Sequence, residues 1–428
     1  MVDIVKINLW SHYVGAAYWD SNNNVANFEF DPSFIIRALN LSPIEMNIDN
    51  PRIFSFGNLN RDTFYGLPGL IADSLPDAYG KVLLDRWLAS NGRAEVNPIE
   101  RLCYQGRRGM GALEFEPAQD MYQLESSSAL EISSLVDIAK QVLDERSELN
   151  VNFGKNEITD ALTQVISIGT SAGGARAKAV IAYNDKTKDV RSGQIDAPEG
   201  YEHWLLKLDG VTNQNLGDPK QYGVIEYIYY LMAREAGIEM MESKLLEENN
   251  RSHFMTKRFD RVGCSEKLHT QTLCGIAHYD YKLLRAYSYE QLFQVMRRLR
   301  LPVNQAEQMY RRMVFNVIAR NQDDHTKNTS FIMDKKGVWS LSPAYDVSWS
   351  YNPKGEWTSK HQMSIMNKWD DFSYSDLEEF AKKINIKNYK KIIEQVKEAV
   401  NSWDILAKNH ALPNDIIREI GNSHRLKL

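Results

Sequence analysis

Asp323-Asp324-His325-Thr326-Lys327-Asn328 follows a helix-like apolar run at residues 313–319 and is itself followed, after a short hairpin, by Asp346. Phosphoryl-transfer enzymes of the kinase type set out their chemistry in this order. The first Asp accepts the proton of the attacking hydroxyl, the Asn binds magnesium, and the later Asp holds magnesium against the nucleotide phosphates. The transfer needs an in-line nucleophile and cations that neutralise developing charge. The spacing therefore predicts Asp323 as the base and Asn328 and Asp346 as magnesium ligands.

This motif leaves two alternatives open. Asp324 is a rival for the base, although only Asp323 has the expected four residues between itself and Asn328. With His325 included, the motif reads Asp-x-His-x-x-Asn, which resembles the catalytic loop of phosphoinositide-type kinases, where protein kinases have His-Arg-Asp. A small-molecule or lipid kinase is therefore an alternative to a protein kinase.

A loop of small residues and a strand lysine lie upstream of the acidic motif. The loop, residues 169–176, falls between two predicted strands, and its backbone N–H groups could approach phosphate oxygens closely. It matches neither Walker A nor GxGxxG, so a tight turn that needs small residues is the alternative. Lys207 lies in an apolar strand, where a lysine is costly unless paired. We expect Lys207 to contact nucleotide phosphates, with Glu226 as a candidate partner; an edge-strand lysine that reaches solvent is the alternative.

The chain as a whole divides into a β-rich first part and an α-rich second part. Alternating apolar residues predict strands at residues 2–9, 25–30, 162–168, 178–183, 203–208, 243–248 and 253–258, and in a hairpin at 329–341. Helical spacing predicts helices at residues 73–87, 130–143 and 223–236, and over most of the chain after residue 261. We expect a two-lobed, kinase-like fold with an α/β N-terminal part and a mostly α-helical C-terminal part. The predicted domains are residues 1–120, 121–258 and 259–428.

Composition bounds the class of protein. The 428 residues carry a net charge of −5, with 43% apolar and 25% charged residues, which is typical of globular proteins and gives no general case for binding nucleic acid or membranes. Three cysteines without ligand spacing, no signal-peptide pattern and no run of membrane-spanning length predict a cytoplasmic protein. A local basic patch is conceivable, although the solvated faces of two helices are the favoured interpretation of its members: Arg297, Arg298, Arg300, Arg311 and Arg312.

Together these motifs resemble the HipA family of serine/threonine kinases, the toxins of bacterial HipA–HipB toxin–antitoxin systems. The resemblance runs through nearly the whole chain, and the catalytic and metal motifs in their correct order are its most specific part. The 257–261 segment resembles the family's nucleotide hinge, whose backbone would contact the adenine. The matching segments are Ser74-Leu75-Pro76-Asp77, residues 107–113, residues 173–178, Lys257-Arg258-Phe259-Asp260-Arg261, the 323–328 motif and Tyr345-Asp346.

The resemblance implies ATP and Mg²⁺ as cofactors and gives a role to each matching residue. Asp323 would accept the proton, and Asn328 and Asp346 would bind magnesium. Ser171 occupies the place of the loop serine that family members autophosphorylate, which ejects the loop and shuts off the kinase. The residues that would contact ATP are Gly173, Gly174, Ala175, Arg176, Ala177, Lys178, Lys207, Lys257, Arg258, Phe259, His325, Lys327 and Tyr345.

The resemblance also implies partners. A small helix-turn-helix antitoxin of HipB type would bind the chain, DNA would be reached only through that antitoxin, and no membrane would take part. The substrate would be a protein of translation, such as an aminoacyl-tRNA synthetase. A catalytically silent, kinase-like scaffold in a repressor complex is the alternative from another class, and the intact set of three site residues argues against it. The sequence departs from the family pattern at Lys257, where an acid is familiar, and at Arg176-Ala177, which replace a polar-acidic pair.

Overall fold

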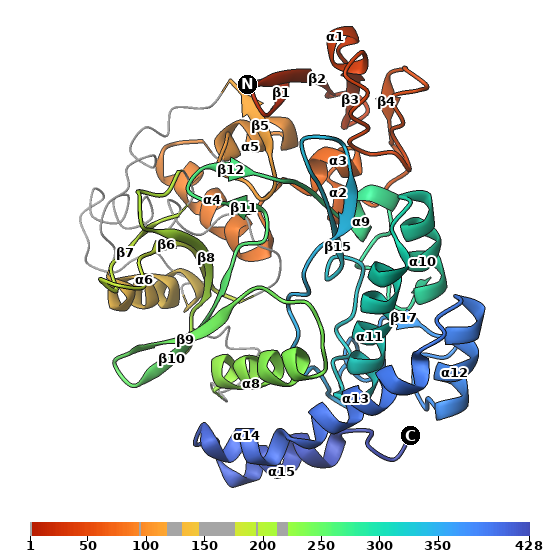
Figure 1. The fold of residues 1–428 in the computed structure, drawn as a ribbon. Coiled ribbons are helices and arrows are strands. Elements are labelled where there is room, and N and C mark those ends of the chain that lie inside the picture. Colours follow the sequence, from red (N-terminus) through yellow and green to blue (C-terminus); the bar gives the residue numbers. More distant parts are fainter. Residues whose placement is uncertain (1, 94–95, 118–130, 145–175, 194–195, 212–220) are drawn as a thin grey trace.

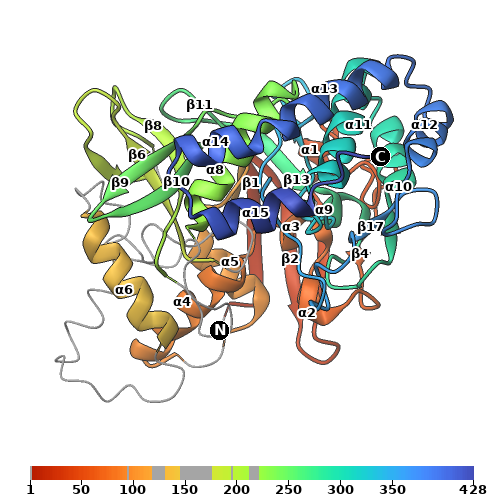
Figure 2. The ribbon, with the colours of Figure 1, turned by 90° about the horizontal axis from the view of Figure 1, so that it is seen from below.

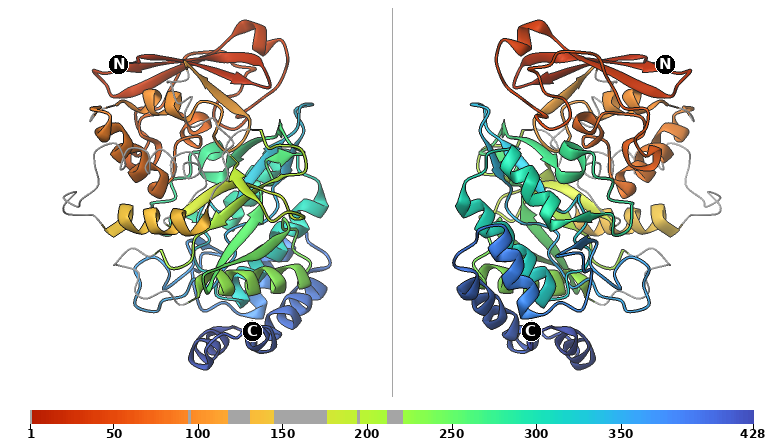
Figure 3. Two further views of the ribbon diagram at one scale, coloured as in Figure 1. Left: turned by 90° about the vertical axis from the view of Figure 1, so that its left-hand side faces the viewer. Right: turned by 90° about the vertical axis from the view of Figure 1, so that its right-hand side faces the viewer.

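The computed structural model describes residues 2–93, 96–117, 131–144, 176–193, 196–211 and 221–428 (Figure 1). Within these residues the fold is mixed α/β, as the sequence predicted. An antiparallel sheet lies at one end of the molecule, the last two helices of the chain lie at the opposite end, and a second antiparallel sheet lies between them (Figure 3). None of the helices in these ranges is both long enough and apolar enough to cross a lipid bilayer.

The N-terminal sheet, called sheet A, has the strand order β4-β3-β2-β1-β5. Alternating apolar and polar side chains give it one buried face, as β1 shows. Val5, Ile7 and Leu9 of β1 are buried, while the residues between them face the other side of the sheet. Its strands are β1 (Ile4–Leu9), β2 (His12–Asp20), β3 (Val25–Phe30), β4 (Phe54–Ser55) and β5 (Leu113–Glu116). The helices of this region are α1 (Pro32–Ile35), α2 (Arg61–Phe64), α3 (Gly69–Ala72), α4 (Ala78–Ser90) and α5 (Pro98–Gln105).

The second sheet, called sheet B, has the order β7-β6-β8-β10-β9. Asn249 and Asn250 join β9 to β10 with positive φ angles of 45° and 62°, as a two-residue hairpin turn requires. In the antiparallel pair of β6 and β8, Lys178 lies directly opposite Lys207, so both side chains leave the same face of the sheet. The strands are β6 (Lys178–Tyr183), β7 (Val190–Ser192), β8 (Glu202–Lys207), β9 (Ser243–Glu248) and β10 (Arg251–Lys257), and the neighbouring helices are α6 (Ile132–Asp144) and α8 (Tyr222–Glu235).

The C-terminal region is mostly helical. Its helices are α9 (Leu273–Ala277), α10 (Tyr289–Arg298), α11 (Val303–Ile318), α12 (Tyr374–Lys383), α13 (Tyr389–Asn401), α14 (Trp403–Asn409) and α15 (Asn414–Ser423). Short strands lie between them: β11 (Arg261–Val262), β12 (Glu266–Lys267), β13 (His269–Thr272), β14 (Tyr287–Ser288), β15 (Ser330–Met333), β16 (Trp339–Leu341) and β17 (Met363–Ser364). Strands β13, β15 and β16 form one small sheet, and α13 and α14 pack against α8 (Figure 2).

Two hydrophobic cores hold these elements together. The larger core contains the inner face of sheet A, helix α8 and the C-terminal helices, with the Tyr229 ring of α8 edge-on to Phe315 and Trp403. The smaller core joins α4 and α6 to sheet B, with Leu83 and Trp204 among its fully buried side chains. Each core therefore draws on more than one of the three predicted domains, and that division stays a prediction.

Some predicted elements have different boundaries. The helix predicted at residues 73–87 begins only at Ala78, because Pro76 disfavours a helical conformation at Leu75 and Asp77 caps the helix by accepting from the Gly80 N–H at 2.7 Å. After residue 261 the sequence predicted a single hairpin, and the structure adds β11–β14 and β17. These strands have two to four residues, too few for alternation to register. The strand predicted at 162–168 lies outside the described residues.

The predicted interpretation of the arginine-rich stretch is wrong for two of its members. Arg312 is buried and donates to the Ser342 carbonyl at 2.6 Å. Arg311 donates to the Ala236 carbonyl at 2.6 Å and to Gln395 at 2.8 Å. Since both guanidinium groups face neighbouring elements of the fold, they form neither a solvated helix face nor a basic patch.

Two glycines bring the N-terminal region against α9. The Gly69 N–H donates to Nε2 of His278 at 3.0 Å, and burial lowers the pKa of His278 to about 4, which keeps the ring neutral and able to accept. A Cβ atom added to Gly69 would lie 2.1 Å from the Gly275 carbonyl oxygen, and one added to Gly275 would lie 2.1 Å from a carboxylate oxygen of Asp73. Helices α3 and α9 can approach this closely only because both positions lack side chains.

Gly69→Ala should therefore destabilise the protein by about 1–3 kcal/mol, because α3 and α9 must move apart to admit the methyl group. Urea unfolding measures this as a lower midpoint at an unchanged slope. Gly57→Ala is the matched control, since no atom lies within 4 Å of its added Cβ. Equal midpoints for the two variants would contradict the role given to this contact.

Candidate active site

The 323–328 loop lies between α11 and β15 and is held by the start of α9. The first two N–H groups of α9, on Leu273 and Cys274, donate to the carbonyl oxygens of Thr329 at 2.8 Å and Thr326 at 3.0 Å. The first N–H groups of a helix have no acceptor inside their own helix, and here these carbonyl oxygens accept their hydrogen bonds. The Thr326 hydroxyl in turn donates to the Tyr279 carbonyl at 2.6 Å. Directed hydrogen bonds thus fix the path of the loop.

Asp324 lies on the buried side of this loop. Its side chain is 1% exposed and accepts from the Tyr289 hydroxyl at 2.8 Å, His361 Nδ1 at 2.9 Å and the Gln362 N–H at 2.7 Å. Burial alone would raise the pKa of Asp324, but His361 and the other donors lower it. With its oxygens occupied by three donors, Asp324 anchors the loop.

Asp323 faces the other way, with a side chain that is 44% exposed. Its carboxylate lies 3.9 Å from His325 Nε2. Partial burial raises the pKa of Asp323, and His325 offsets only part of that effect. A carboxylate that is accessible and more basic than usual can accept a proton, whereas the rival Asp324 cannot.

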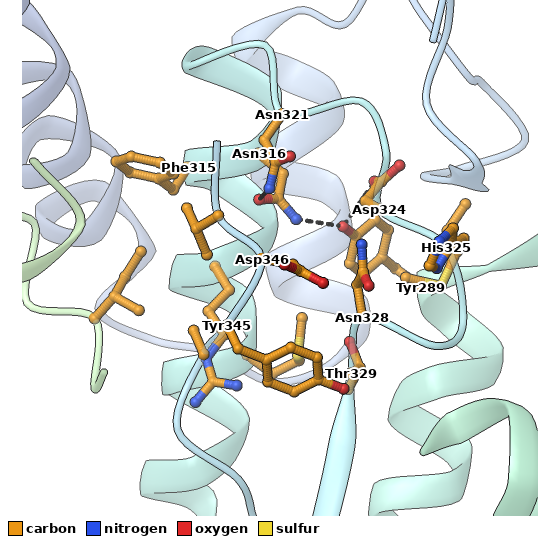
Figure 4. Close-up of a pocket in the computed structure, with 16 residues that line it drawn as sticks. Tyr289, Phe315, Asn316, Asn321, Asp324, His325, Asn328, Thr329, Tyr345 and Asp346 are labelled. Atoms are coloured by element: carbon orange, nitrogen blue, oxygen red, sulfur yellow. Dashed lines mark hydrogen bonds between the residues drawn. The ribbon is translucent and has the colours of Figure 1, made fainter. Parts of the chain in front are cut away.

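Asn328 and Asp346 face each other beside this loop. The Asn328 amide donates to the backbone carbonyl of Asp323 at 2.8 Å, which ties the two ends of the loop together and leaves the amide oxygen to accept or to ligate. Asp346 follows β16 with a φ angle of +52°, and its carboxylate points toward Asn328 (Figure 4). Both belong to a recess that Asp324, His325 and Tyr345 also line.

Lys207 joins three elements at this point. Its ammonium lies 2.5 Å from Glu226 of α8 and also donates to Asp346. Burial would lower the pKa of Lys207, but the two carboxylates raise it. For Asp346 the directions are reversed: burial alone would raise its pKa, but the nearby Lys207 and Lys178 lower it. Lys207 and Asp346 are therefore both charged, and the lysine is not the solvent-facing edge residue that was the alternative.

Lys178 supplies a second cation on the same face of sheet B. Its ammonium lies 3.0 Å from the carboxylate of Asp77, and both side chains are buried, with exposures of 4% and 5%. Asp77 belongs to the Ser74–Asp77 segment singled out in the sequence. The structure thus gives that segment a place beside the two lysines.

Tyr345 links the loop to the stretch after β10. Its hydroxyl donates to the Lys327 carbonyl at 2.7 Å and accepts from Ser330 at 2.5 Å, while its ring stacks on Phe259 at 5.6 Å between centroids. His325 is edge-on to the Tyr281 ring at 5.3 Å, and the Lys327 ammonium lies 5.0 Å from the centre of the same ring.

The side chains of Lys257 and Arg258, in the predicted hinge, pair with acids of the protein, and the backbone contact with adenine that the resemblance implies there stays a prediction. The Arg258 guanidinium is 1% exposed and pairs with Asp260 at 2.7 Å, and the N–H of Arg258 donates to the His203 carbonyl, so its side chain is not available to a nucleotide. The Lys257 ammonium pairs with Glu202 at 2.9 Å and Glu242 at 2.7 Å on the outside of sheet B.

The predicted loop is described only at its end. The Arg176 guanidinium lies 4.1 Å from the centre of the Tyr222 ring, and Ala177 is buried, with its carbonyl accepting from the Leu208 N–H at 3.0 Å. Ser171, Gly173, Gly174 and Ala175 lie outside the described residues.

Sequence reasoning missed several residues that support the site. His361 Nδ1 lies 2.9 Å from the Asp324 carboxylate, and its Nε2 lies 3.3 Å from an Arg425 nitrogen. Asp73 accepts hydrogen bonds from Thr272. No local pattern marks these residues, because their partners are far away in the sequence.

The ligand chemistry at Asn328 and Asp346 fits magnesium. An amide oxygen and a carboxylate are hard oxygen donors, and magnesium is usually held by one or two carboxylates together with phosphates and water. In the part of the chain that the structure describes, no cluster of three or more His, Cys, Asp or Glu side chains could enclose an ion by itself. The site therefore suits a metal that arrives with a phosphate ligand.

The different environments of the two neighbouring acids predict different costs on mutation. Asp324→Asn should destabilise the protein by about 1–3 kcal/mol, because the amide cannot accept from all three buried donors. Asp323→Asn should change stability by less than about 0.5 kcal/mol, as at an accessible site. Denaturant unfolding near pH 7 compares the two variants, and a larger loss in Asp323→Asn would reverse our assignment of anchor and accessible acid.

Comparisons with known proteins agree with this architecture. The chain matches the HipA N-terminal domain over residues 5–116 and the HipA-like C-terminal domain over residues 170–403. Its fold is similar to a solved complex of HipA, HipB and operator DNA from Shewanella oneidensis, with 16% identity, a TM-score of 0.67, and coverage of 98% of this chain and 95% of that chain.

A second solved structure, the Helicobacter pylori proinflammatory kinase CtkA, gives 12% identity and a TM-score of 0.36, with coverage of 59% of this chain and 87% of that chain. A search of curated proteins found no match. Since the matched C-terminal domain alone spans more than half of the chain, this protein belongs to the HipA family.

Proposed function

We propose that this protein is an ATP- and Mg²⁺-dependent serine/threonine protein kinase of the HipA type, with the two-lobed arrangement of kinases. The observation that carries the proposal is the meeting of Lys207, Glu226 and Asp346 beside the accessible Asp323. Kinases use a strand lysine paired with a helix glutamate for the nucleotide phosphates, and a metal-binding Asp next to them. The three groups come from β8, α8 and the segment after β16, which is the expected distribution.

Each charged group has a distinct task in this proposal. Asp323 accepts the proton of the attacking hydroxyl as that oxygen bonds to the γ-phosphorus and the bond to the ADP oxygen breaks. Lys207 and Lys178 present positive charge from one face of sheet B to the phosphates. Asn328 and Asp346 would hold Mg²⁺, which neutralises charge that develops on the transferred group. Asp324 keeps the loop in place and takes no part in proton transfer.

The biological setting is proposed from the family. The chain would be the toxin of a toxin–antitoxin pair and would bind a small helix-turn-helix antitoxin. It would reach DNA only through that antitoxin. The solved Shewanella complex, to which the fold is similar, contains HipA, HipB and operator DNA. A translation protein, such as an aminoacyl-tRNA synthetase, would be the substrate, in the cytoplasm. Ser171 would be autophosphorylated and so switch off the kinase. The motif Asp-x-His-x-x-Asn keeps a lipid or small-molecule kinase as the second candidate.

Asp323→Asn should lower phosphoryl transfer by at least about 10²-fold while leaving the affinity for Mg-ATP within about threefold, because it removes the proton acceptor and no phosphate contact. Incubating wild type and variant with labelled ATP and a cell lysate measures transfer, and calorimetry measures binding. Label on protein supports the proposal, label on a small molecule supports the second candidate, and none with wild type supports the scaffold. Near wild-type transfer by Asp323→Asn would rule out its role as the base.

Asp346→Ala should instead weaken binding of Mg-ATP by at least about tenfold, because the carboxylate is a magnesium ligand in this proposal. Calorimetry with ATP in the presence and absence of Mg²⁺ tests it, and the variant should lose the difference between the two conditions. If the variant keeps wild-type affinity and activity, Asp346 serves only as a turn residue with its φ of +52°.

A further inference from the structure

Asp73, from the N-terminal part of the chain, makes a directed contact with the C-terminal part. Its carboxylate accepts from the Thr272 N–H at 2.8 Å and from the Thr272 hydroxyl at 2.9 Å to each oxygen. Thr272 lies 199 residues away and ends β13. The Asp73 carboxylate therefore fixes both the backbone and the side chain of the residue that precedes α9.

Thr272 passes this constraint on to the 323–328 loop. Its hydroxyl accepts from the Gly275 N–H at 3.0 Å and so caps α9. The next two N–H groups, on Leu273 and Cys274, donate to carbonyls of Thr329 and Thr326. The path from Asp73 to the loop thus consists of two sets of hydrogen bonds joined by the backbone from Thr272 to Cys274.

The geometry leaves this contact little freedom. A Cβ on Gly275 would lie 2.1 Å from Asp73 Oδ2, so α9 packs directly against the carboxylate. The charges of Asp73 and Lys327 also attract each other, and Lys327 belongs to the 323–328 loop.

An apolar residue would serve equally well if position 73 only had to fill space between two helices. Removing a carboxylate from water is costly, and the partial burial of Asp73 raises its pKa. The cost is offset here by hydrogen bonds that all end on one residue, Thr272, at the point where the chain turns into α9. The contact therefore fixes the position of Thr272 and of the start of α9, and does not only add stability.

We propose that Asp73 is a positioning residue that sets the place of the 323–328 loop, and so of Asp323, through Thr272 and the first turn of α9. The proposal rests on the proposed phosphoryl transfer and extends it. It makes the N-terminal part of the chain necessary for catalysis, because the loop that carries the base is aligned from there.

Asp73→Asn should lower kcat roughly 10- to 100-fold while KM for ATP changes less than about threefold, because a small displacement of the base slows transfer without removing a phosphate contact. Thr272→Val, which has the shape of Thr but no hydroxyl, should do the same. Thr272→Ser, which keeps the hydroxyl, should stay close to wild type. Steady-state kinetics with labelled ATP gives both constants for each variant.

Asp376→Asn is the matched control. Asp376 is also a largely enclosed carboxylate that accepts from the N–H and hydroxyl of Ser373, both at 2.8 Å, in the capping box of α12. It accepts in addition from the Lys368 ammonium at 2.7 Å, and neither partner belongs to α9 or to the 323–328 loop. It should cost comparable stability, measured by thermal unfolding, and leave kcat and KM near wild type. An equal fall in kcat for Asp376→Asn and Asp73→Asn would overturn the proposal, since the effect would then be general destabilisation.

Amide hydrogen exchange provides a readout that needs no activity. In Asp73→Asn the amides of Thr272, Leu273 and Cys274 should exchange at least about tenfold faster than in wild type, whereas Asp376→Asn should leave them unchanged. Unchanged exchange in Asp73→Asn would overturn the proposed path. Absence of transfer by wild type would overturn the proposed function and the catalytic consequence for Asp73, whereas faster exchange would still support positioning of the loop.

Discussion

The ammonium of Lys207 links three separate elements of the fold through its two ion pairs. A lysine on a strand inside the protein must be neutralised by nearby acids, and Glu226 and Asp346 do so from two different elements. Sheet B, helix α8 and the segment after β16 are therefore held at a fixed separation. Asp346 takes part in this arrangement with its carboxylate ionised, which is the form that a hard cation needs.

The neighbouring acids Asp323 and Asp324 show how one short motif can serve two purposes. Successive residues of an extended loop point in opposite directions, so one side chain reaches solvent while the next is enclosed. The enclosed carboxylate meets Tyr289 and His361 and fixes the backbone; the exposed one is then available at a defined place. Stability and chemistry are thus divided between adjacent positions.

Much of the site was predictable because its motif is local in sequence. The order of Asp323, Asn328 and Asp346, and the strand lysine, require only spacing and the type of element. Asp73 and His361 were not predictable, since their partners lie 199 and 37 residues away and neither position has a periodic pattern. Strand β1 alternates clearly between buried and more exposed residues, whereas β13 has four residues and exists through its pairing with β15. Arg258 fits a nucleotide-hinge motif by sequence alone, and only the fold shows its side chain turned inward.

The inward-turned cluster of Arg258, Asp260 and Arg261 has a consequence for the effect of salt. Burial would raise the pKa of Asp260, but the two arginines hold it well below the ordinary value, and the cluster also binds the backbone at Gly109 and Gly111. Dissolved ions screen charges over about 10 Å at 0.1 M, but only where they can approach. A surface pair such as Arg101–Asp85 is open to them, whereas Asp260 is 0% exposed. The contact of Asp260 and Arg261 with the backbone at Gly109 and Gly111, just before β5, should therefore keep its geometry from dilute buffer to concentrated salt.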